Sequence, residues 1–245
     1  MKNLYIYLSN DKNPHFSKNA EELAKVQIEN SFNLGWKTED IIFVTNFDFE
    51  YMSVKAIKID SPLCKWHAKA NKIWGIVHMF QNNMIVDDMF FHDLDAFQVD
   101  SFLDVPDDVK GYDLAFPNYG HRERYNTGII FFSLASKDLF IDLKKFMIEN
   151  NSADEEEGLM YMFDMGKNKR YTNRFKILDV RYNIGKHHTE KKFIESRKPI
   201  MVVHFHPTIE PNYAFYCLGE NKLKTPIIKK ELSDLIEKHC FNKTL

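Results

Sequence analysis

The chain has 245 residues, 44% of them hydrophobic, which is enough to bury one substantial core. Its 33 basic and 35 acidic residues leave a formal charge of -2, so no overall positive field would hold it on nucleic acid or an anionic membrane. No repeat, low-complexity tract or Pro/Gly/Ser-rich linker interrupts it, and we expect a single domain over residues 1–245.

The N-terminal segment begins with a short apolar run, residues 4–8, that is followed by Asn10 and Asp11. A run this short is typical of a first strand and not of a signal peptide or a membrane span. The three cysteines are widely spaced and form no C-x-x-C pair, which indicates reduced thiols and neither a disulfide framework nor a zinc site. We therefore expect a cytoplasmic protein without a membrane span.

Apolar runs of strand length alternate with helix-periodic segments along the chain. The expected strands are 4–8, 41–45, either 84–86 or 89–91, 127–132 and 200–205. The expected helices are 17–34, 65–79, 137–148, a segment that starts at Asp154, and 229–239. In the first helix, Ser17 is a typical N-cap residue and Gly35 a typical stop signal. The alternation predicts an α/β fold with a mostly parallel central sheet flanked by helices.

The most informative segment is 90–97, in which an apolar strand ends at two carboxylates, Asp93 and Asp95. Side chains at positions i and i+2 of a strand point to the same side, so we expect both acids to face one cation. Mn²⁺ and Mg²⁺ prefer oxygen ligands, and a departing diphosphate needs such an ion to neutralise its charge. Pairs of aspartates are also common on solvated surfaces, so the context of this pair decides its meaning.

The context resembles the metal-binding region of the GT-A glycosyltransferases, in which an apolar run is followed by Asp-x-Asp and a small residue, here Ala96. Three later segments resemble elements of the same superfamily in the same order. They are the asparagine, glycine and apolar strand of 126–132, the acidic helix start of 154–159 and the histidine-bearing strand of 202–205. The resemblance spans roughly residues 3–207. Within the superfamily, the sequence is similar to retaining enzymes of the glycogenin and galactosyltransferase type.

The resemblance implies a GT-A (Rossmann-like) domain that transfers a sugar from a nucleoside-diphosphate sugar with Mn²⁺ or Mg²⁺ as cofactor. The implied metal ligands are Asp93, Asp95 and His204. The implied catalytic carboxylates, which deprotonate or orient the acceptor, are Asp154 and Glu155. The implied donor-binding residues are Ser9, Asn10, Lys69, Lys72, Asp93, Asn126 and Thr127.

The sequence departs from the family pattern at two places. A glutamate stands where the acidic helix start, here 154–159, usually has glutamine, and residues 206–208 replace the glycine and lysine that usually follow the late histidine. His204 can also be a core histidine, with His206 as the fallback ligand. Lys65, Lys69 and Lys72 share one face of the expected helix and can equally form a solvated surface. Ser9 and Asn10 are also ordinary turn residues.

Two other functional classes stay open at this stage. Asp93-Leu94-Asp95 also matches the nucleophile and acid of haloacid-dehalogenase-like phosphoryl-transfer enzymes, although that motif normally follows the first strand and continues with Gly-Thr. A non-catalytic nucleotide-sugar-binding module is the third class. The donor base and sugar stay open, as does the acceptor, which can be a glycan, a protein, a lipid or a modified nucleobase. A late metal-binding histidine is typical of retaining enzymes, and we expect retention.

Overall fold

The computed structural model describes residues 1–118, 125–152, 154–163, 171, 173–185, 193–205, 209–221 and 223–241. Its centre is a seven-stranded sheet in the order β10-β8-β9-β6-β1-β2-β5. The bounds of these strands are β1 Lys2–Tyr7, β2 Ile41–Thr45, β5 Ile57–Lys58, β6 Met89–His92, β8 Leu114–Pro117, β9 Ile129–Phe132 and β10 Phe175–Leu178. All neighbouring strands pair in parallel except β9, which runs antiparallel to β6 and β8. The mostly parallel sheet is therefore confirmed.

Two smaller sheets complete the strands. One has three strands in the order β11-β12-β7, with bounds β7 Ala96–Gln98, β11 Ile184–Gly185 and β12 Val202–His204. The other is a hairpin of β3 Glu50–Tyr51 and β4 Val54–Lys55. The chain passes from β6 of the large sheet to β7 of the three-stranded sheet within three residues, so the two sheets meet at residues 93–95.

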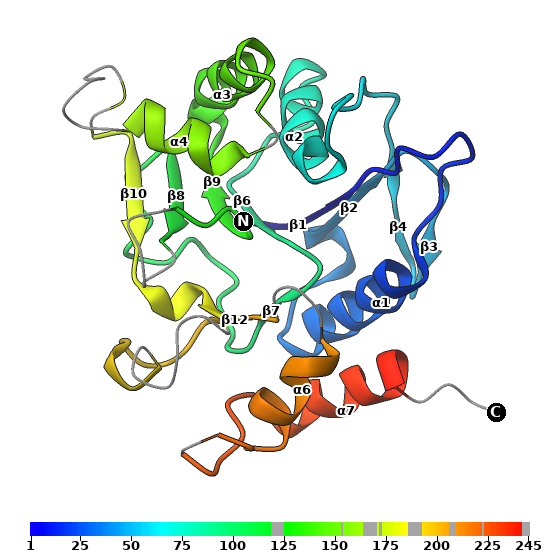
Figure 1. The fold of residues 1–245 in the computed structure, drawn as a ribbon, viewed down its shortest axis with the longest axis vertical. Helices are drawn as coiled ribbons and strands as arrows, with labels where there is room; N and C mark the ends of the chain where they lie inside the picture. Colours follow the sequence, from blue (N-terminus) through cyan, green and yellow to red (C-terminus); the bar gives the residue numbers. More distant parts are fainter. Residues whose placement is uncertain are drawn as a thin grey trace.

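Helices cover both faces of the large sheet, as Figure 1 shows. Their bounds are α1 Lys18–Asn33, α2 Asn71–Gln81, α3 Lys137–Glu149, α4 Glu155–Phe163, α6 Glu210–Cys217 and α7 Lys230–Ile236, followed by a π-helical turn Glu237–Phe241. Short 3-10 turns lie at Thr38–Asp40, Ala68–Ala70, Leu134–Ser136 and Val180–Tyr182. No helix in the described ranges is long and apolar enough to span a membrane.

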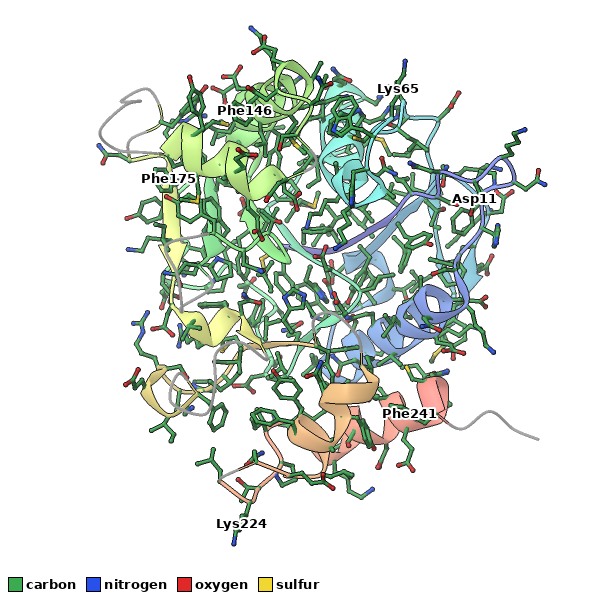
Figure 2. All side chains as sticks on the ribbon, in the orientation of Figure 1. Asp11, Lys65, Phe146, Phe175, Lys224 and Phe241 are labelled. Atoms are coloured by element: carbon green, nitrogen blue, oxygen red, sulfur yellow. The ribbon has the colours of Figure 1, made fainter. Side chains whose placement is uncertain are left out.

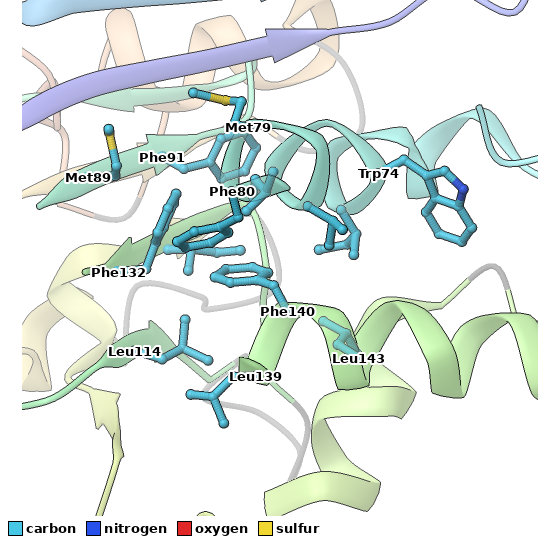
Figure 3. Packing of buried hydrophobic residues seen from close by; sticks show 14 of the residues in the cluster. Trp74, Met79, Phe80, Met89, Phe91, Leu114, Phe132, Leu139, Phe140 and Leu143 are labelled. Carbon is cyan, nitrogen blue, oxygen red and sulfur yellow. The ribbon is translucent and has the colours of Figure 1, made fainter. Parts of the chain in front are cut away.

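Strand alternation divides the core between the two faces of the sheet. On β6, Phe91 packs with α2, α3 and α4, whereas Phe90 packs with α1 and the three-stranded sheet. On the first face, the rings of Phe80, Phe132 and Phe140 meet with centroids 5.0 to 5.9 Å apart (Figure 3). Both faces of β6 are thus fixed by aromatic packing, which holds the end of this strand in place.

The expected elements 4–8, 17–34, 41–45, 89–91 and 137–148 are present within a few residues of their predicted ends. Gly35, with a φ of 96°, follows the end of α1, but Ser17 caps that helix without a side-chain hydrogen bond. The expected helix 65–79 is wrong at its start, because α2 begins only at Asn71. Lys65 therefore shares no helix face with Lys72 and lies exposed at the periphery (Figure 2).

Candidate active site

The turn 93–95 carries both aspartates and is held by the strands around it. The backbone N–H of Asp93 donates to the Gly128 carbonyl at 2.8 Å, and the Asp95 carbonyl accepts from the N–H of Phe205 at 2.8 Å. The Ala96 N–H closes the turn on the Asp93 carbonyl at 3.0 Å. We expected strand alternation to align the two acids, and this reason was wrong, because β6 ends at His92. The turn brings both carboxylates to the same place instead.

Asp93, Asp95 and His204 converge there, each with a potential ligand atom within 4.8 Å of the other two. His204 ends β12, next to β7, and its ring is held at Nδ1 by the Asn183 Oδ1 at 3.0 Å. Its Nε2 lies 3.3 Å from the Asp95 Oδ1. Two carboxylates and one imidazole form a donor set that suits Mn²⁺ or Mg²⁺, so these residues fit the cation that the motif predicts.

The electrostatics of this trio favour an added cation. Burial raises the pKa of Asp93; the Lys72 ammonium opposes this effect, and the Asp95 carboxylate adds to it. Burial would lower the pKa of His204, but the carboxylates of Asp95 and Asp93 hold it above its ordinary value. Burial is the main cause of the Asp93 shift and the two carboxylates cause the His204 shift, and a divalent ion at this place would offset both effects.

Gly128 leaves the space that the His204 ring occupies. A Cβ atom at position 128 would lie 2.5 Å from the His204 Cε1 and 2.9 Å from its Nδ1, well inside van der Waals contact. The Asn126 side chain accepts from the Gly128 N–H at 2.9 Å and fixes this close approach. The glycine of the 126–128 motif is therefore required by the histidine of β12.

Lys72, near the start of α2, places its ammonium between two carboxylates. Its Nζ lies 2.9 Å from the Glu155 Oε1 and 3.2 Å from the Asp93 Oδ2, and it donates to the Thr127 carbonyl at 3.1 Å. Burial would lower the pKa of Lys72, but Asp93 and Glu155 raise it above its usual range. The lysine therefore stays charged, and it links the start of α4 to the turn 93–95.

The acidic residues at the start of α4 have two roles, one structural and one electrostatic. Asp154 caps the helix, because its Oδ1 accepts from the N–H groups of Glu156 and Glu157 at 3.0 and 3.2 Å. Glu155 accepts from the Thr127 hydroxyl at 2.5 Å in addition to Lys72. Burial would raise the pKa of Glu155, but Lys72 and Thr127 together lower it. Glu155 therefore stays ionised.

Ser9 and Asn10 follow β1 and are fixed by two asparagines that the motif analysis missed. Asn46 accepts from the Ser9 N–H at 3.0 Å and donates to its carbonyl at 2.8 Å. Asn71 donates to the Leu8 carbonyl at 3.1 Å and to the Asn10 side chain at 2.6 Å. Asn71 is buried and Asn46 half-buried, and no sequence pattern would have identified them, because their partners lie 37 to 63 residues away along the chain.

One cavity of about 950 Å³ joins these groups. The residues predicted for the site that line it are Ser9, Asn10, Lys69, Lys72, Asp93, Asp95, Asn126, Thr127, Asp154, Glu155 and His204. Glu156, which was not predicted as a site residue, also lines it, as do residues of α1 and Cys240 of the C-terminal turn. His206, the fallback ligand, lies outside the described residues. The predicted residues are thus in one place, and their individual roles stay predictions.

Comparison with solved structures identifies the class of fold, which is that of glycosyltransferases. The galactosyltransferase LgtC, in complex with donor and acceptor sugar analogues, matches with a TM-score of 0.58 at 12% identity over 100% of this chain and 97% of its own. A glycosyltransferase involved in glycosylation of the major capsid of PBCV-1 matches with a TM-score of 0.54 at 15% identity over 85% of this chain and 94% of its own. No family model and no curated protein matches the sequence.

These similarities show that the chain has the GT-A fold, as the motif order predicted. The Asp-x-Asp turn follows β6 in the middle of the chain, beside the late histidine. A haloacid-dehalogenase-like enzyme is therefore not favoured.

Proposed function

We propose that the protein is a metal-dependent glycosyltransferase that moves a sugar from a nucleoside-diphosphate sugar to an acceptor, with retention at the anomeric carbon. The observation that carries this proposal is the convergence of Asp93, Asp95 and His204 in the wall of a 950 Å³ cavity. The cavity opens at the carboxyl end of β1, where ligands bind in open α/β sheets. The fold similarity to glycosyltransferases supports it.

The cavity has the size for a donor and part of an acceptor. Small-molecule sites usually enclose about 300–1,000 Å³, and this one is near the upper end of that range. Ser9 and Asn10 would contact the nucleoside at one side, and Lys69 would approach the donor phosphates from the cavity wall. The donor sugar would lie between the acidic start of α4 on one side and Asn126 and Thr127 on the other.

Asp93 and Asp95 would supply oxygen ligands to the cation, and His204 would supply Nε2. When bound, Mn²⁺ or Mg²⁺ would stabilise the negative charge that develops on the departing nucleoside diphosphate. The hydrogen bond from the His204 Nδ1 to Asn183 would keep Nε2 directed at the two aspartates.

The state of the acidic residues supports retention. An inverting enzyme needs a carboxylate base, and a base works best with a pKa near the working pH. The pKa of Glu155 is lowered, and Asp154 is engaged in capping α4, so neither is tuned for proton abstraction. We propose that Glu155 and Asp154 orient the acceptor and Lys72, and that a retaining reaction needs no separate base from them.

The proposal is tested by screening nucleoside-diphosphate sugars for nucleotide release, with and without Mn²⁺. We expect release from one donor class only with Mn²⁺, and complete loss of it in Asp95→Asn. Asp48→Asn is the matched control, because the Asp48 side chain is 88% exposed and forms a surface ion pair with Lys58. Unchanged turnover in Asp95→Asn would contradict the proposal.

The same screen separates the other two classes. Manganese-dependent nucleotide binding without release, for any donor or acceptor, would indicate a binding module. Stabilisation by fluoroberyllate with Mg²⁺, and by no nucleotide, would instead favour phosphoryl-transfer chemistry.

A further inference from the structure

One side chain of α1 forms two hydrogen bonds to the turn that carries Asp95. Gln27 is fully buried, and its Nε2 donates to the carbonyl of Leu94 at 2.8 Å and to that of Ala96 at 3.0 Å. These two carbonyls belong to the residues on either side of Asp95. A single amide therefore fixes the backbone both before and after the predicted metal ligand.

Other hydrogen bonds to the backbone of this turn come from residues next to β9 and β12 and from the end of β6. The Asp93 N–H and the Asp95 carbonyl bond to backbone groups of Gly128 and Phe205. The His92 Nδ1 lies 2.6 Å from the Ala96 carbonyl. Gln27 adds a connection from a separate helix, and it is not among the residues that line the cavity.

The orientation of the Gln27 amide has an energetic cost. Its Oε1 is buried and has no hydrogen-bond partner within the described part of the chain. An unpaired buried carbonyl is unfavourable, and an apolar side chain at this position would avoid it among neighbours such as Ala24 and Ile28. The two hydrogen bonds from Nε2 to the turn offset this cost.

Asn30, three residues further along α1, makes the same kind of contact away from Asp95. It is also buried, and its Nδ2 donates to the Gln98 carbonyl of β7 at 2.8 Å. Asn30 and Gln27 both attach α1 to β7. Of these two amides, Gln27 bonds to the carbonyls on either side of Asp95, whereas Asn30 bonds two residues further along β7.

We propose that Gln27 is a positioning residue, which holds the turn 93–95 so that the Asp95 carboxylate meets His204 in the geometry that a divalent cation requires. The inference rests on the proposed function, because it assigns the cation site to this turn. Partners of this kind, which orient a ligand without touching the metal, typically contribute about 10- to 100-fold to metal affinity.

The test compares Gln27→Met with Asn30→Leu, two substitutions of similar size change that each remove one buried amide of α1. Mn²⁺ alone is titrated into each protein, and free Mn²⁺ is measured by electron paramagnetic resonance. We expect the Kd for Mn²⁺ to rise about 10- to 100-fold in Gln27→Met and to stay within about twofold of wild type in Asn30→Leu. Urea unfolding of both variants measures their loss of stability in parallel.

The outcomes separate the two proposals. If wild type binds Mn²⁺ and Gln27→Met binds it equally well, the positioning role is wrong and the proposed function stands. Equal weakening in both variants would assign the effect to docking of α1 and would also overturn the positioning role. If wild type binds no Mn²⁺, both proposals fail.

A second variant covers the case in which Gln27→Met does not fold. Gln27→Asn keeps a buried amide but is one methylene too short to reach both carbonyls, so the same loss of Mn²⁺ affinity is expected. The kinetic signature in either variant is a higher Mn²⁺ requirement, with kcat at saturating Mn²⁺ recovering toward that of wild type. Wild-type Mn²⁺ affinity in Gln27→Asn would overturn the inference.

Discussion

At the scale of single residues, the site depends on a few close approaches that a motif records only as letters. The glycine of 126–128 is explained by the His204 ring, which comes from a strand near the end of the described chain. The pair of aspartates is explained by a turn and not by strand alternation. The residue types in the cavity could be predicted, whereas the supporting amides of Gln27, Asn46 and Asn71 could not, because their partners are distant backbone groups.

Gly128→Ala is expected to displace the His204 ring and weaken the cation site. The added Cβ would lie 2.5 Å from the His204 Cε1, so we expect Mn²⁺ affinity to fall about tenfold or more. Gly158→Ala is the control, because its Cβ would meet the Leu143 Cδ1 at the same 2.5 Å, between α3 and α4. Calorimetric titration with Mn²⁺ measures both, and equal affinities in the two variants would contradict the prediction.

Lys72→Met is expected to destabilise the protein by leaving two carboxylates without their shared cation. The Lys72 side chain is only 12% exposed, and removing one partner of such a buried ion pair costs about 3 kcal/mol. Saturating Mn²⁺ should recover part of this loss by compensating the charge of Asp93. Lys69→Met, at an exposed position of the same cavity wall, should change stability by less than about 0.5 kcal/mol. Urea unfolding with and without Mn²⁺ measures these changes. Wild-type stability in Lys72→Met would refute the idea that Lys72 stabilises the fold by neutralising Asp93 and Glu155.

At the scale of elements, long periodic segments were predictable and short strands were not. The helix 17–34 and the strand 41–45 agree with the structure because their apolar patterns match the faces that they bury. Strands β7, β10 and β11 have two to four residues, too few for a period to emerge, and their pairing is set by distant partners, whereas β12 lies within the expected strand 200–205. The helix expected at 65 begins later, because the His67 side chain accepts from the Lys69 N–H and closes a 3-10 turn first.

The attachment of the C-terminal turn to α1 gives a pH-dependent prediction. Glu29 accepts from the Tyr51 hydroxyl at 2.6 Å, and the Lys238 and His239 side chains lie 2.9 and 2.6 Å from it. Burial would raise the pKa of Glu29, but these partners lower it below its ordinary 4.5. The contribution to stability is therefore present above pH 4.5 and is lost as the pH falls through the lower pKa of the folded state.

We expect Glu29→Gln to lower the free energy of unfolding by about 1–2 kcal/mol at pH 7, with a smaller difference from wild type as the pH falls below 4.5. Thermal unfolding of both proteins between pH 7 and pH 3 measures this. Glu21→Gln removes an exposed pair with Lys25 and should differ from wild type by a few tenths of a kcal/mol at most. A deficit in Glu29→Gln that does not change with pH would argue against the ionised carboxylate as its cause.

At the scale of the whole molecule, the motif order predicted the fold class because it records where polar residues follow buried strands. The cavity itself was not predictable in shape, since its walls come from segments between β1 and the C-terminal turn. The limits of the single domain expected over 1–245 stay a prediction, as do cytoplasmic location and the identity of donor and acceptor.

A ligand that binds this cavity should stabilise the whole fold. At a concentration of about 100 times Kd, a nucleoside diphosphate with Mn²⁺ adds about 2.7 kcal/mol, which for a chain of this size raises Tm by about 5–10 °C. We expect one nucleotide base to give this shift with Mn²⁺ and much less without it. Thermal scans over a nucleotide panel measure it, with Asp95→Asn as the control. A response that does not depend on the metal would contradict the site.

The pairing of β7 with β12 brings His204 to Asp95 across about a hundred residues of chain. During synthesis the aspartates leave the ribosome long before their histidine partner, and β8, β9 and β10 of the large sheet are made in between. The proposed catalyst would therefore mature in one late step, when β12 joins β7. A chain arrested before that step would be inactive, and no partial activity would precede completion.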